Sequence, residues 1–135
     1  MKDSDIVITS DSTCDLGERI IAERNISILP LTVILGNDSF KDGVDIVPDD
    51  IFAYFEKTGE LPKTGAPSTA DYEQFFGKFV EQGKTVIHFN ISSKASGSNG
   101  FAQAAQKKFG DKVYVIDSLA LSTGQGLLLM KACAL

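Results

Sequence analysis

Residues 85–98 read TVIHFNISSKASGS, and the order of residue types in this stretch decides the fold. Thr85 to Phe89 is a short run rich in β-branched and aromatic residues, which predicts a strand. A hydroxyl-rich loop from Ile91 to Ser98 follows, and Phe101 and Ala105 then recur at helical spacing. A strand that enters a helix through such a loop is the repeating unit of α/β sheets.

The same order of strand, polar loop and helix recurs on both sides of this stretch. Ile6 to Ile8 is followed by the cap and turn formers of Asp11 to Asp15, and the strand Lys112 to Ile116 is followed by a loop and a helix from Ser122 to Leu135. We therefore predict one α/β domain over residues 1–135, with a mainly parallel sheet flanked by helices. The central strands should be buried on both faces; they are Ile6–Ile8, Val86–Phe89 and Val113–Ile116.

One segment departs from this alternation. The apolar run Ile26 to Leu35 is interrupted by Pro30, which cannot donate to a central ladder and so favours an edge position or a break into two strands. Gly36-Asn37-Asp38 then gives a hairpin signal. We expect a small antiparallel excursion here, a helix opening at Pro48, and a loop over 61–68 before the next helix. Ser68 can cap that helix, with Asp71 at the third helical position.

Composition excludes several classes of function. The formal charge of −5 and the pI near 4.7 disfavour nucleic-acid binding, which needs Lys and Arg against phosphates. Cys14 and Cys133 lack metal-ligand spacing, so no metal site or cofactor is predicted. The polar start of the chain lacks a signal peptide, and the apolar run Leu127 to Met130 is far too short to cross a membrane. We expect a cytoplasmic protein with reduced thiols.

Hydroxyl-rich loops are the candidate binding elements. In open α/β sheets, ligands bind outside the carboxyl ends of the strands. Three such loops, Thr9–Cys14, Ile91–Ser98 and Ser118–Thr123, are rich in Ser and Thr, and the Thr64 loop joins them from outside the strands. Hydroxyls and N–H groups at helix starts hold anions well, although Ser and Thr at these positions also serve simply as helix caps.

Residues for catalysis are mostly missing. His88 is the only histidine and lies in an apolar strand, so a structural role is expected and a Ser-His-Asp arrangement has no support. Asp11-Ser12-Thr13 resembles the nucleophile loop of haloacid dehalogenase phosphatases, but Thr13 stands where that loop has a second Asp. A small hydrolase or phosphatase built on the Asp11 loop is the alternative function, and a plain interaction domain is a third.

Five motifs, in order along the chain, resemble those of the DegV family of bacterial proteins. The motifs cover nearly the whole chain, and their order and spacing make a chance resemblance improbable. They are Thr9-Ser10-Asp11-Ser12-Thr13-Cys14-Asp15-Leu16, Pro30-Leu31-Thr32-Val33, Pro62-Lys63-Thr64-Gly65-Ala66-Pro67-Ser68, Ile91-Ser92-Ser93-Lys94-Ala95-Ser96-Gly97-Ser98 and Val115-Ile116-Asp117-Ser118.

The resemblance implies a carrier that binds one long-chain fatty acid in a buried tunnel and is not itself an enzyme. Some members present the fatty acid to a separate kinase, which phosphorylates the carboxylate to an acyl phosphate. The family's carboxylate-holding residues fall on Thr64 and Ser96, with backbone groups at Gly97 assisting. We also expect Ser12, Ser93 and Gly65 as secondary candidates for ligand contact.

The chain also departs from the family pattern. Gly65 and Ala66 replace the common Ser and Gln, and Ser98-Asn99-Gly100-Phe101 replaces Thr-Tyr-Gln-Ser, so the tunnel mouth differs. The resemblance covers the N-terminal lipid-binding domain, while a C-terminal domain that closes the tunnel in the family is absent from this chain. We therefore expect exposed apolar surface and self-association, or a longer parent protein.

Overall fold

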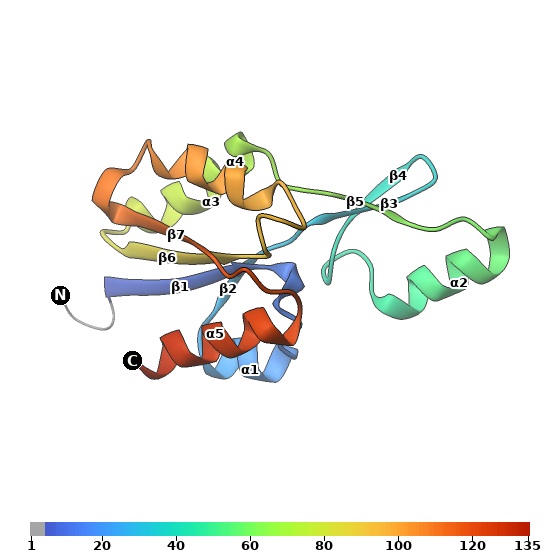
Figure 1. Cartoon of the computed structure of the whole chain (residues 1–135), viewed down its shortest axis with the longest axis horizontal. Helices are drawn as coiled ribbons and strands as arrows, with labels where there is room; N and C mark the ends of the chain where they lie inside the picture. The colour runs from blue at the N-terminus through green and yellow to red at the C-terminus, as the bar shows by residue number, and fades with distance from the viewer. Residues whose placement is uncertain (1–4) are drawn as a thin grey trace.

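A computed structural model describes residues 5–135, which form an α/β body with an arm projecting from one end (Figure 1). The body is built on a four-stranded sheet in the order β2-β1-β6-β7, and every neighbouring pair is parallel. These strands are β2 (Ser27–Leu29), β1 (Ile6–Asp11), β6 (Thr85–Asn90) and β7 (Val113–Asp117). The predicted mainly parallel sheet is confirmed.

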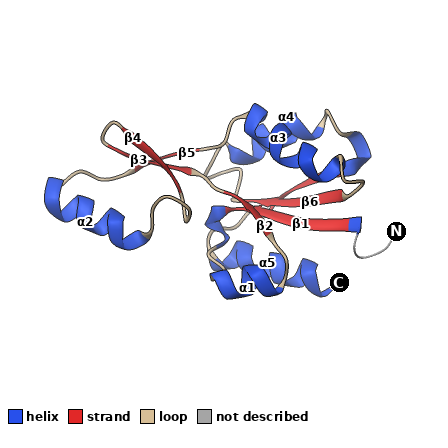
Figure 2. Cartoon of the chain, turned by 180° about the vertical axis from the view of Figure 1, so that it is seen from behind, coloured by secondary structure: helices blue, strands red, loops and turns tan. Residues whose placement is uncertain are grey.

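Helices cover both faces of this sheet, as Figures 1 and 2 show from opposite sides. On one face α3 (Thr69–Val80) and α4 (Ser98–Gln106) enclose a core that includes Val7, Phe76 and Val86. On the other face α1 (Glu18–Glu23) and α5 (Thr123–Ala134) enclose a core around Phe89 and Leu129. Successive β6 residues alternate between the two cores, because side chains along a strand point to opposite faces.

Burial of β7 is less complete than the sequence suggested. Val113 is fully buried under α4, but Tyr114 and Ile116 on the opposite face are 49% and 38% exposed. The expectation that all three central strands are buried on both faces is therefore wrong for β7. The reason is its position: β7 is an edge strand, and α5 packs under β1 and β6 rather than under β7.

The arm comprises residues 32–65 and holds the predicted antiparallel excursion. Its sheet has the order β4-β3-β5, formed by β3 (Thr32–Leu35), β4 (Asp38–Lys41) and β5 (Lys63–Gly65), and α2 (Pro48–Thr58) packs beside it. Gly36 has φ +61°, as the tight β3–β4 turn requires. Pro30 breaks the apolar run, so that β2 belongs to the body and β3 to the arm.

The chain returns from the arm to the body at Ser68, which caps α3. The Ser68 side chain accepts a hydrogen bond from Asp71 N at 3.1 Å, and Asp71 Oδ2 accepts one from Ser68 N at 2.8 Å. This reciprocal capping box was predicted from the sequence and is confirmed.

Candidate functional site

The loops that follow β1, β6 and β7 meet at the carboxyl edge of the sheet. Ile91 N donates to Asp11 Oδ2 at 2.7 Å, which joins the second loop to the end of β1. Ser92 N donates to Ala120 O at 2.9 Å, which joins the second loop to the third. Ser122 Oγ donates to Asp15 Oδ2 at 2.6 Å and closes the set. The three hydroxyl-rich loops therefore form one connected surface.

The loop between β7 and α5 has an unusual backbone. Leu119 and Ser122 have φ values of 51° and 53°, in the left-handed region that side chains other than glycine rarely adopt. Each such residue costs on the order of 1–3 kcal/mol unless its surroundings hold it in place. The bond from Ser122 to Asp15 and the contact of Ala120 with Ser92 supply that support.

A buried polar cluster lies beneath these loops, centred on Asp11. The Asp11 carboxylate is fully buried. Its Oδ1 accepts hydrogen bonds from Thr13 N at 3.1 Å, Thr13 Oγ1 at 2.6 Å and Gln125 Nε2 at 2.9 Å. Its Oδ2 accepts from Ile91 N and, at 3.4 Å, from Asn90 Nδ2. A buried carboxylate needs several donors of this kind to offset its lost hydration.

This geometry speaks against the hydrolase or phosphatase alternative. A carboxylate nucleophile must reach a substrate, but both oxygens of Asp11 are enclosed and engaged by donors that fix three loops. Asp11 therefore acts as a structural anchor for the loop surface.

Gln125 is a member of this cluster that the sequence analysis missed. It is fully buried, and its Nε2 donates to Ser10 Oγ at 3.0 Å as well as to Asp11. Its Oε1 lies 3.0 Å from Thr13 Oγ1, whose one proton is shared between this oxygen and the nearer Asp11 Oδ1. The adjacent Gly126 allows this approach, because a Cβ there would lie 2.8 Å from Cys14 O. The GQG sequence at the start of the last helix was the available signal.

His88 is structural, as predicted. It is fully buried among the rings of Tyr72, Phe75 and Phe76, and its Nδ1 lies 2.7 Å from Thr9 Oγ1. Burial lowers the pKa of His88 to about 4, against a smaller opposing effect of the Asp11 charge. The imidazole is therefore neutral at physiological pH.

Ser96 and Gly97 lie at the start of α4, where the sequence placed them. Ser96 Oγ is 3.0 Å from Ser98 Oγ and accepts a hydrogen bond from Ser98 N at 3.2 Å. Gly97 is exposed at the N-cap, which has no side-chain cap. Asn99, on the first turn, is 3% exposed, and its Nδ2 has no hydrogen-bond partner within residues 5–135. This buried donor is a second residue that the sequence analysis missed.

Thr64 lies in the arm, and its local structure differs from the prediction. It was expected on a free loop, but it is the middle residue of β5, paired with Val33 of β3, and its side chain is exposed. Lys63-Thr64-Gly65 adds a third strand to the hairpin. The prediction of a loop was based on the flanking prolines and did not include this strand. Gly65 is half-buried opposite Thr32.

The secondary candidates have structural partners of their own. Ser12 Oγ accepts a hydrogen bond from Leu31 N at 3.1 Å, which ties the loop after β1 to the root of the arm. Ser93 N donates to Asp117 Oδ1 at 3.0 Å, and the Ser93 side chain is exposed. These contacts hold the loops together, and Ser93 remains an exposed residue.

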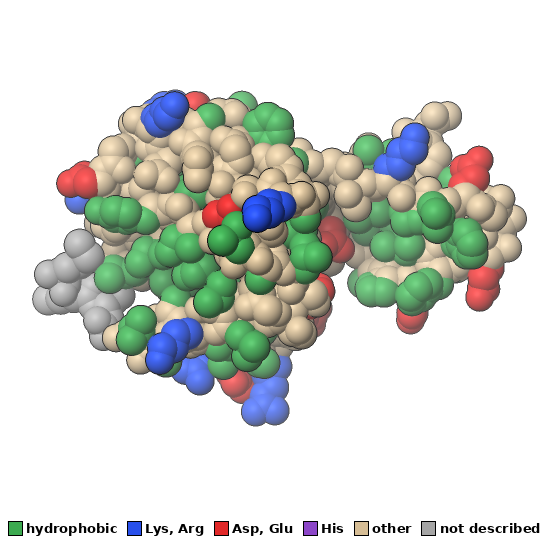
Figure 3. All heavy atoms as spheres, in the orientation of Figure 1, with side chains coloured by type: hydrophobic (Ala, Val, Ile, Leu, Met, Phe, Trp, Pro, Cys, Tyr) green, Lys and Arg blue, Asp and Glu red, His purple; other side chains and the backbone are tan. Residues whose placement is uncertain are grey.

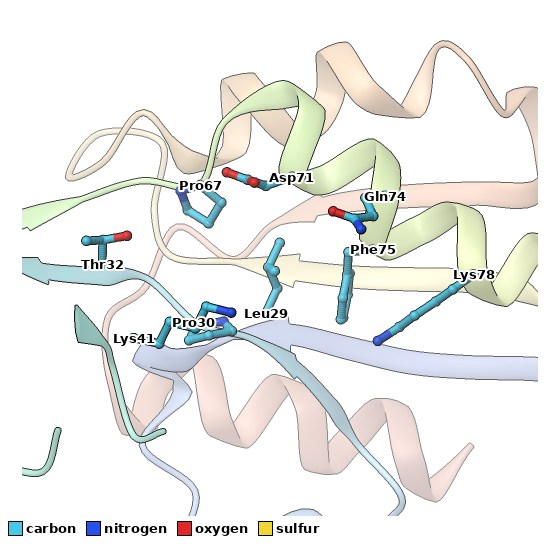
Figure 4. A pocket seen from close by; sticks show the side chains of 9 residues that line it. All are labelled: Leu29, Pro30, Thr32, Lys41, Pro67, Asp71, Gln74, Phe75 and Lys78. Atoms are coloured by element: carbon cyan, nitrogen blue, oxygen red, sulfur yellow. The ribbon is translucent and has the colours of Figure 1, made fainter. Parts of the chain in front are cut away.

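A hollow of about 380 Å³ lies where the arm joins the body (Figure 4). Phe75 and Lys78 of α3 form one wall, while Leu29 and Pro30 face them. Thr64, Ser96 and Gly97 are not among its lining residues. The hollow is thus separate from the predicted headgroup position.

Within residues 5–135, no group of three or more His, Cys, Asp or Glu side chains is arranged to hold a metal ion. Over the same range, no helix has the length and apolar character needed to span a membrane.

Fold and loops together define a class of protein: an α/β domain whose carboxyl-edge loops form one connected, hydroxyl-rich surface. Comparison with known proteins gives the family. The model described as "Uncharacterised protein, DegV family" matches residues 5–135, and the chain belongs to the DegV family.

Three similar proteins show how far this relationship extends. A DegV domain-containing protein of Clostridium acetobutylicum is 37% identical over 131 residues, covering 96% of this chain and 47% of the relative. A structure described as fatty acid binding of a DegV family protein from Thermus thermophilus has a TM-score of 0.88 at 29% identity, covering 96% and 46%. The Streptococcus pneumoniae fatty acid kinase B3 protein, loaded with linoleic acid, has a TM-score of 0.75 at 27% identity, covering 96% and 47%. The chain spans about half the length of the curated relatives it matches.

Proposed function

We propose that this chain is a non-catalytic carrier domain for a long-chain fatty acid, with the carboxylate held at the start of α4. The observation that carries the proposal is the set of donors at the start of this helix: the Ser96 hydroxyl, the first-turn N–H groups that follow Ser98, and, on the same turn, the buried Nδ2 of Asn99, which has no partner within residues 5–135. N–H groups in the first turn of a helix have no intrahelical partner and favour an anion. The fatty acids of the similar structures support the same ligand class.

An apolar ring stands beside this position. Phe101 is 45% exposed, and its Cε2 is 3.3 Å from where a Gly97 Cβ would lie. A fatty acid needs such a surface next to its headgroup, since each buried methylene contributes about 0.8 kcal/mol. Phe101 therefore supports an amphipathic ligand over a small inorganic anion.

Thr64 is proposed as the second hydroxyl donor, supplied by the arm. Its exposed side chain on β5 is available for a ligand, and Gly65 beside it is half-buried. Ser12 and Ser93 are assigned secondary roles, because Ser12 already bonds to Leu31 N and the contact at Ser93 is made by its backbone.

Titration with linoleic acid tests these assignments. Thr64→Val and Ser96→Ala should each weaken binding by roughly 1.5–3 kcal/mol, the range for hydrogen bonds to charged groups. Ser12→Ala is the matched control and should have a smaller effect. If both substitutions left binding of the acid unchanged, the carboxylate would be held elsewhere. Turnover of an acyl or phosphate ester would instead support the alternative function, a small hydrolase or phosphatase built on the Asp11 loop.

We further propose that the bound fatty acid is presented to a partner kinase for acyl phosphate formation. Similarity to the fatty acid kinase B3 protein supports this step. A fatty acid kinase catalytic subunit with ATP should then form acyl phosphate only when the loaded carrier is present. A cytoplasmic location is part of the same proposal, since both cysteines are free thiols, as in a reducing compartment.

The apolar face between β7 and α5 supports the proposal that a second unit covers this domain. Figure 3 shows hydrophobic side chains gathered on this face of the body. The exposed residues in these elements and the loop between them are Tyr114, Ile116, Leu119, Leu121, Leu127 and Leu128. Patches of this kind promote association, so residues 1–135 alone should self-associate in light scattering. A stable monomer that retains fatty acid would count against a covering unit.

A further inference from the structure

The arm exposes large apolar side chains around α2, and together they are called the α2 surface. They lie in this helix and in the segments next to it, and each is at least 45% exposed: Val44, Val47, Phe52, Phe55 and Leu61. Figure 3 shows hydrophobic side chains gathered over the arm, with acidic side chains at their margin. The strands of the arm contribute no exposed large apolar residue, so a partner would contact side chains of α2 rather than add a strand to the sheet.

Two phenylalanines form the centre of the α2 surface. Phe52 and Phe55 are three positions apart, so they are neighbours on the surface of the helix. Ile51 and Tyr54 pack against the small core of the arm and fix the helix to its sheet. One side of α2 therefore holds the helix in place, while the rings of Phe52 and Phe55 remain available to a partner.

Acidic residues border these rings. Asp49 and Glu56 lie three positions before and four after Phe52, so both carboxylates adjoin its ring on the helix surface. Neither of them forms an ion pair within residues 5–135. Lys57, the basic residue of α2, is five positions from Phe52 and falls on a different side of the helix. The α2 surface thus has an apolar centre and an acidic border.

We propose that the α2 surface is a docking site for a basic amphipathic helix of a partner protein. The apolar side of that helix packs on Phe52 and Phe55, and its Lys or Arg residues lie beside the acidic border. Charge complementarity decides the occupant. An acidic border is repelled by an anionic bilayer. A second copy offers no net positive charge, because the chain outside residues 32–65 has eleven acidic and ten basic residues.

Fluorescence anisotropy with a labelled helical peptide of leucine and lysine, with leucine along one side, tests the docking site. The chain should bind this peptide, and it should bind the same peptide with glutamate in place of lysine roughly tenfold more weakly. Phe52→Ala should weaken binding of the lysine peptide roughly tenfold, because a ring that becomes buried on binding is lost. Leu127→Ala, at a residue of α5 that is 70% exposed, is the matched control and should leave the affinity unchanged.

The acidic border is tested by a second pair of variants. Glu56→Gln should weaken binding of the lysine peptide about threefold at low ionic strength and have little effect at high ionic strength, because exposed charges are screened by salt. Glu81→Gln, at an exposed residue that ends α3 in the body, is its control and should leave the affinity unchanged. Circular dichroism of each variant checks that the fold is retained.

Four results would overturn the inference. Equal affinity for the lysine and glutamate peptides would remove the role of the acidic border, and unchanged affinity in Phe52→Ala would place the peptide elsewhere. Binding to phosphatidylcholine and phosphatidylglycerol vesicles that is lost in Phe52→Ala would assign the α2 surface to a membrane. Self-association that is lost in Phe52→Ala but kept in Leu127→Ala would assign it to a second copy. None of these results depends on fatty acid binding, so the proposed function is tested separately.

Discussion

The body and the arm bury their side chains to very different extents. The body has two cores, one on each face of its sheet, with Tyr72 and Phe76 fully enclosed. The arm has a single small core formed by Val33, Leu35 and Ile46, and α2 has no buried residue at all. Since burial of apolar surface is the main stabilising term, the arm should open far more readily than the body.

Charge widens this difference. Residues 32–65 carry seven of the 18 acidic residues but only three of the 13 basic ones, so four of the five net negative charges lie on the arm. Mutual repulsion disfavours the compact state of such a segment. The proposed carboxylate site is then divided between the body, which contains Ser96 and should be rigid, and the arm, which contains Thr64 and should open more readily. Ligand binding should therefore order the arm more than the body.

The largest expected effect comes from matched truncations of two phenylalanines. Phe76→Ala should lower the free energy of unfolding by about 3–5 kcal/mol, because it removes a fully buried ring from the body. Phe52→Ala, in α2, removes a ring that is 64% exposed and should change stability by less than about 0.5 kcal/mol. Urea denaturation measures both. Equal losses in the free energy of unfolding would show that the core of the arm stabilises the fold as much as the cores of the body do.

A pH titration probes how tightly the body excludes water. His88 has a pKa near 4 in the folded state and an ordinary value of 6.5, so the unfolded chain binds more protons between these limits. The free energy of unfolding should therefore be reduced as pH falls from 6.5 to 4, by on the order of 3 kcal/mol from this residue. Above pH 6.5 the contribution is fully present.

His88→Gln isolates this contribution, since the carboxylates titrate alike in both proteins. The difference in unfolding free energy between wild type and variant should shrink across this pH window. The single imidazole can also be followed directly by NMR. A midpoint near 6.5 in the folded protein would mean that water reaches the interior of the body and would remove the main contrast with the arm.

Local patterns predicted most of the body and the arm's hairpin. The strand at Thr85, the break at Pro30 and the cap at Ser68 each depend on residues within a few positions, and all three are confirmed. The exposed face of β7 was not predicted, because it depends on which strand lies at the edge. The strand at Thr64 depends on pairing with Val33, more than 30 positions away.

The polar cluster shows the same limit for the candidate site. Ser96 and Gly97 could be proposed from the loop sequence. The roles of Gln125 and Tyr72 could not, because their partners lie on β1 and on β6, far away in sequence. A buried hydrogen-bond network depends on tertiary packing, and Gln or Tyr in a helix pattern is compatible with many roles.

A smaller effect than those of the Phe76 and His88 substitutions is expected at the junction of the two regions. Ser68→Ala removes the cap of α3 and should lower the free energy of unfolding by about 1 kcal/mol. The change also bears on Asp71, whose pKa is lowered chiefly by its hydrogen bonds from the backbone and side chain of Ser68, with a smaller effect from Lys41 of the arm. Because the pKa is lower when folded, this carboxylate stabilises the fold above its unfolded pKa, and the effect is lost at more acidic pH.

NMR titration of Asp71 in two variants then compares how strongly a residue of the arm and a residue of the body each lower the pKa of this carboxylate. Ser68→Ala should raise the pKa of Asp71 toward its ordinary value, since one of the two donors on the body is lost. Lys41→Met removes only the positive charge that the arm places near Asp71 and should produce a smaller rise, because an exposed charge is screened by water and salt. If Lys41→Met produced the larger shift in the pKa of Asp71, the arm would be packed firmly against the body. The proposed division of the carboxylate site between a rigid body and a more readily opened arm would then be wrong.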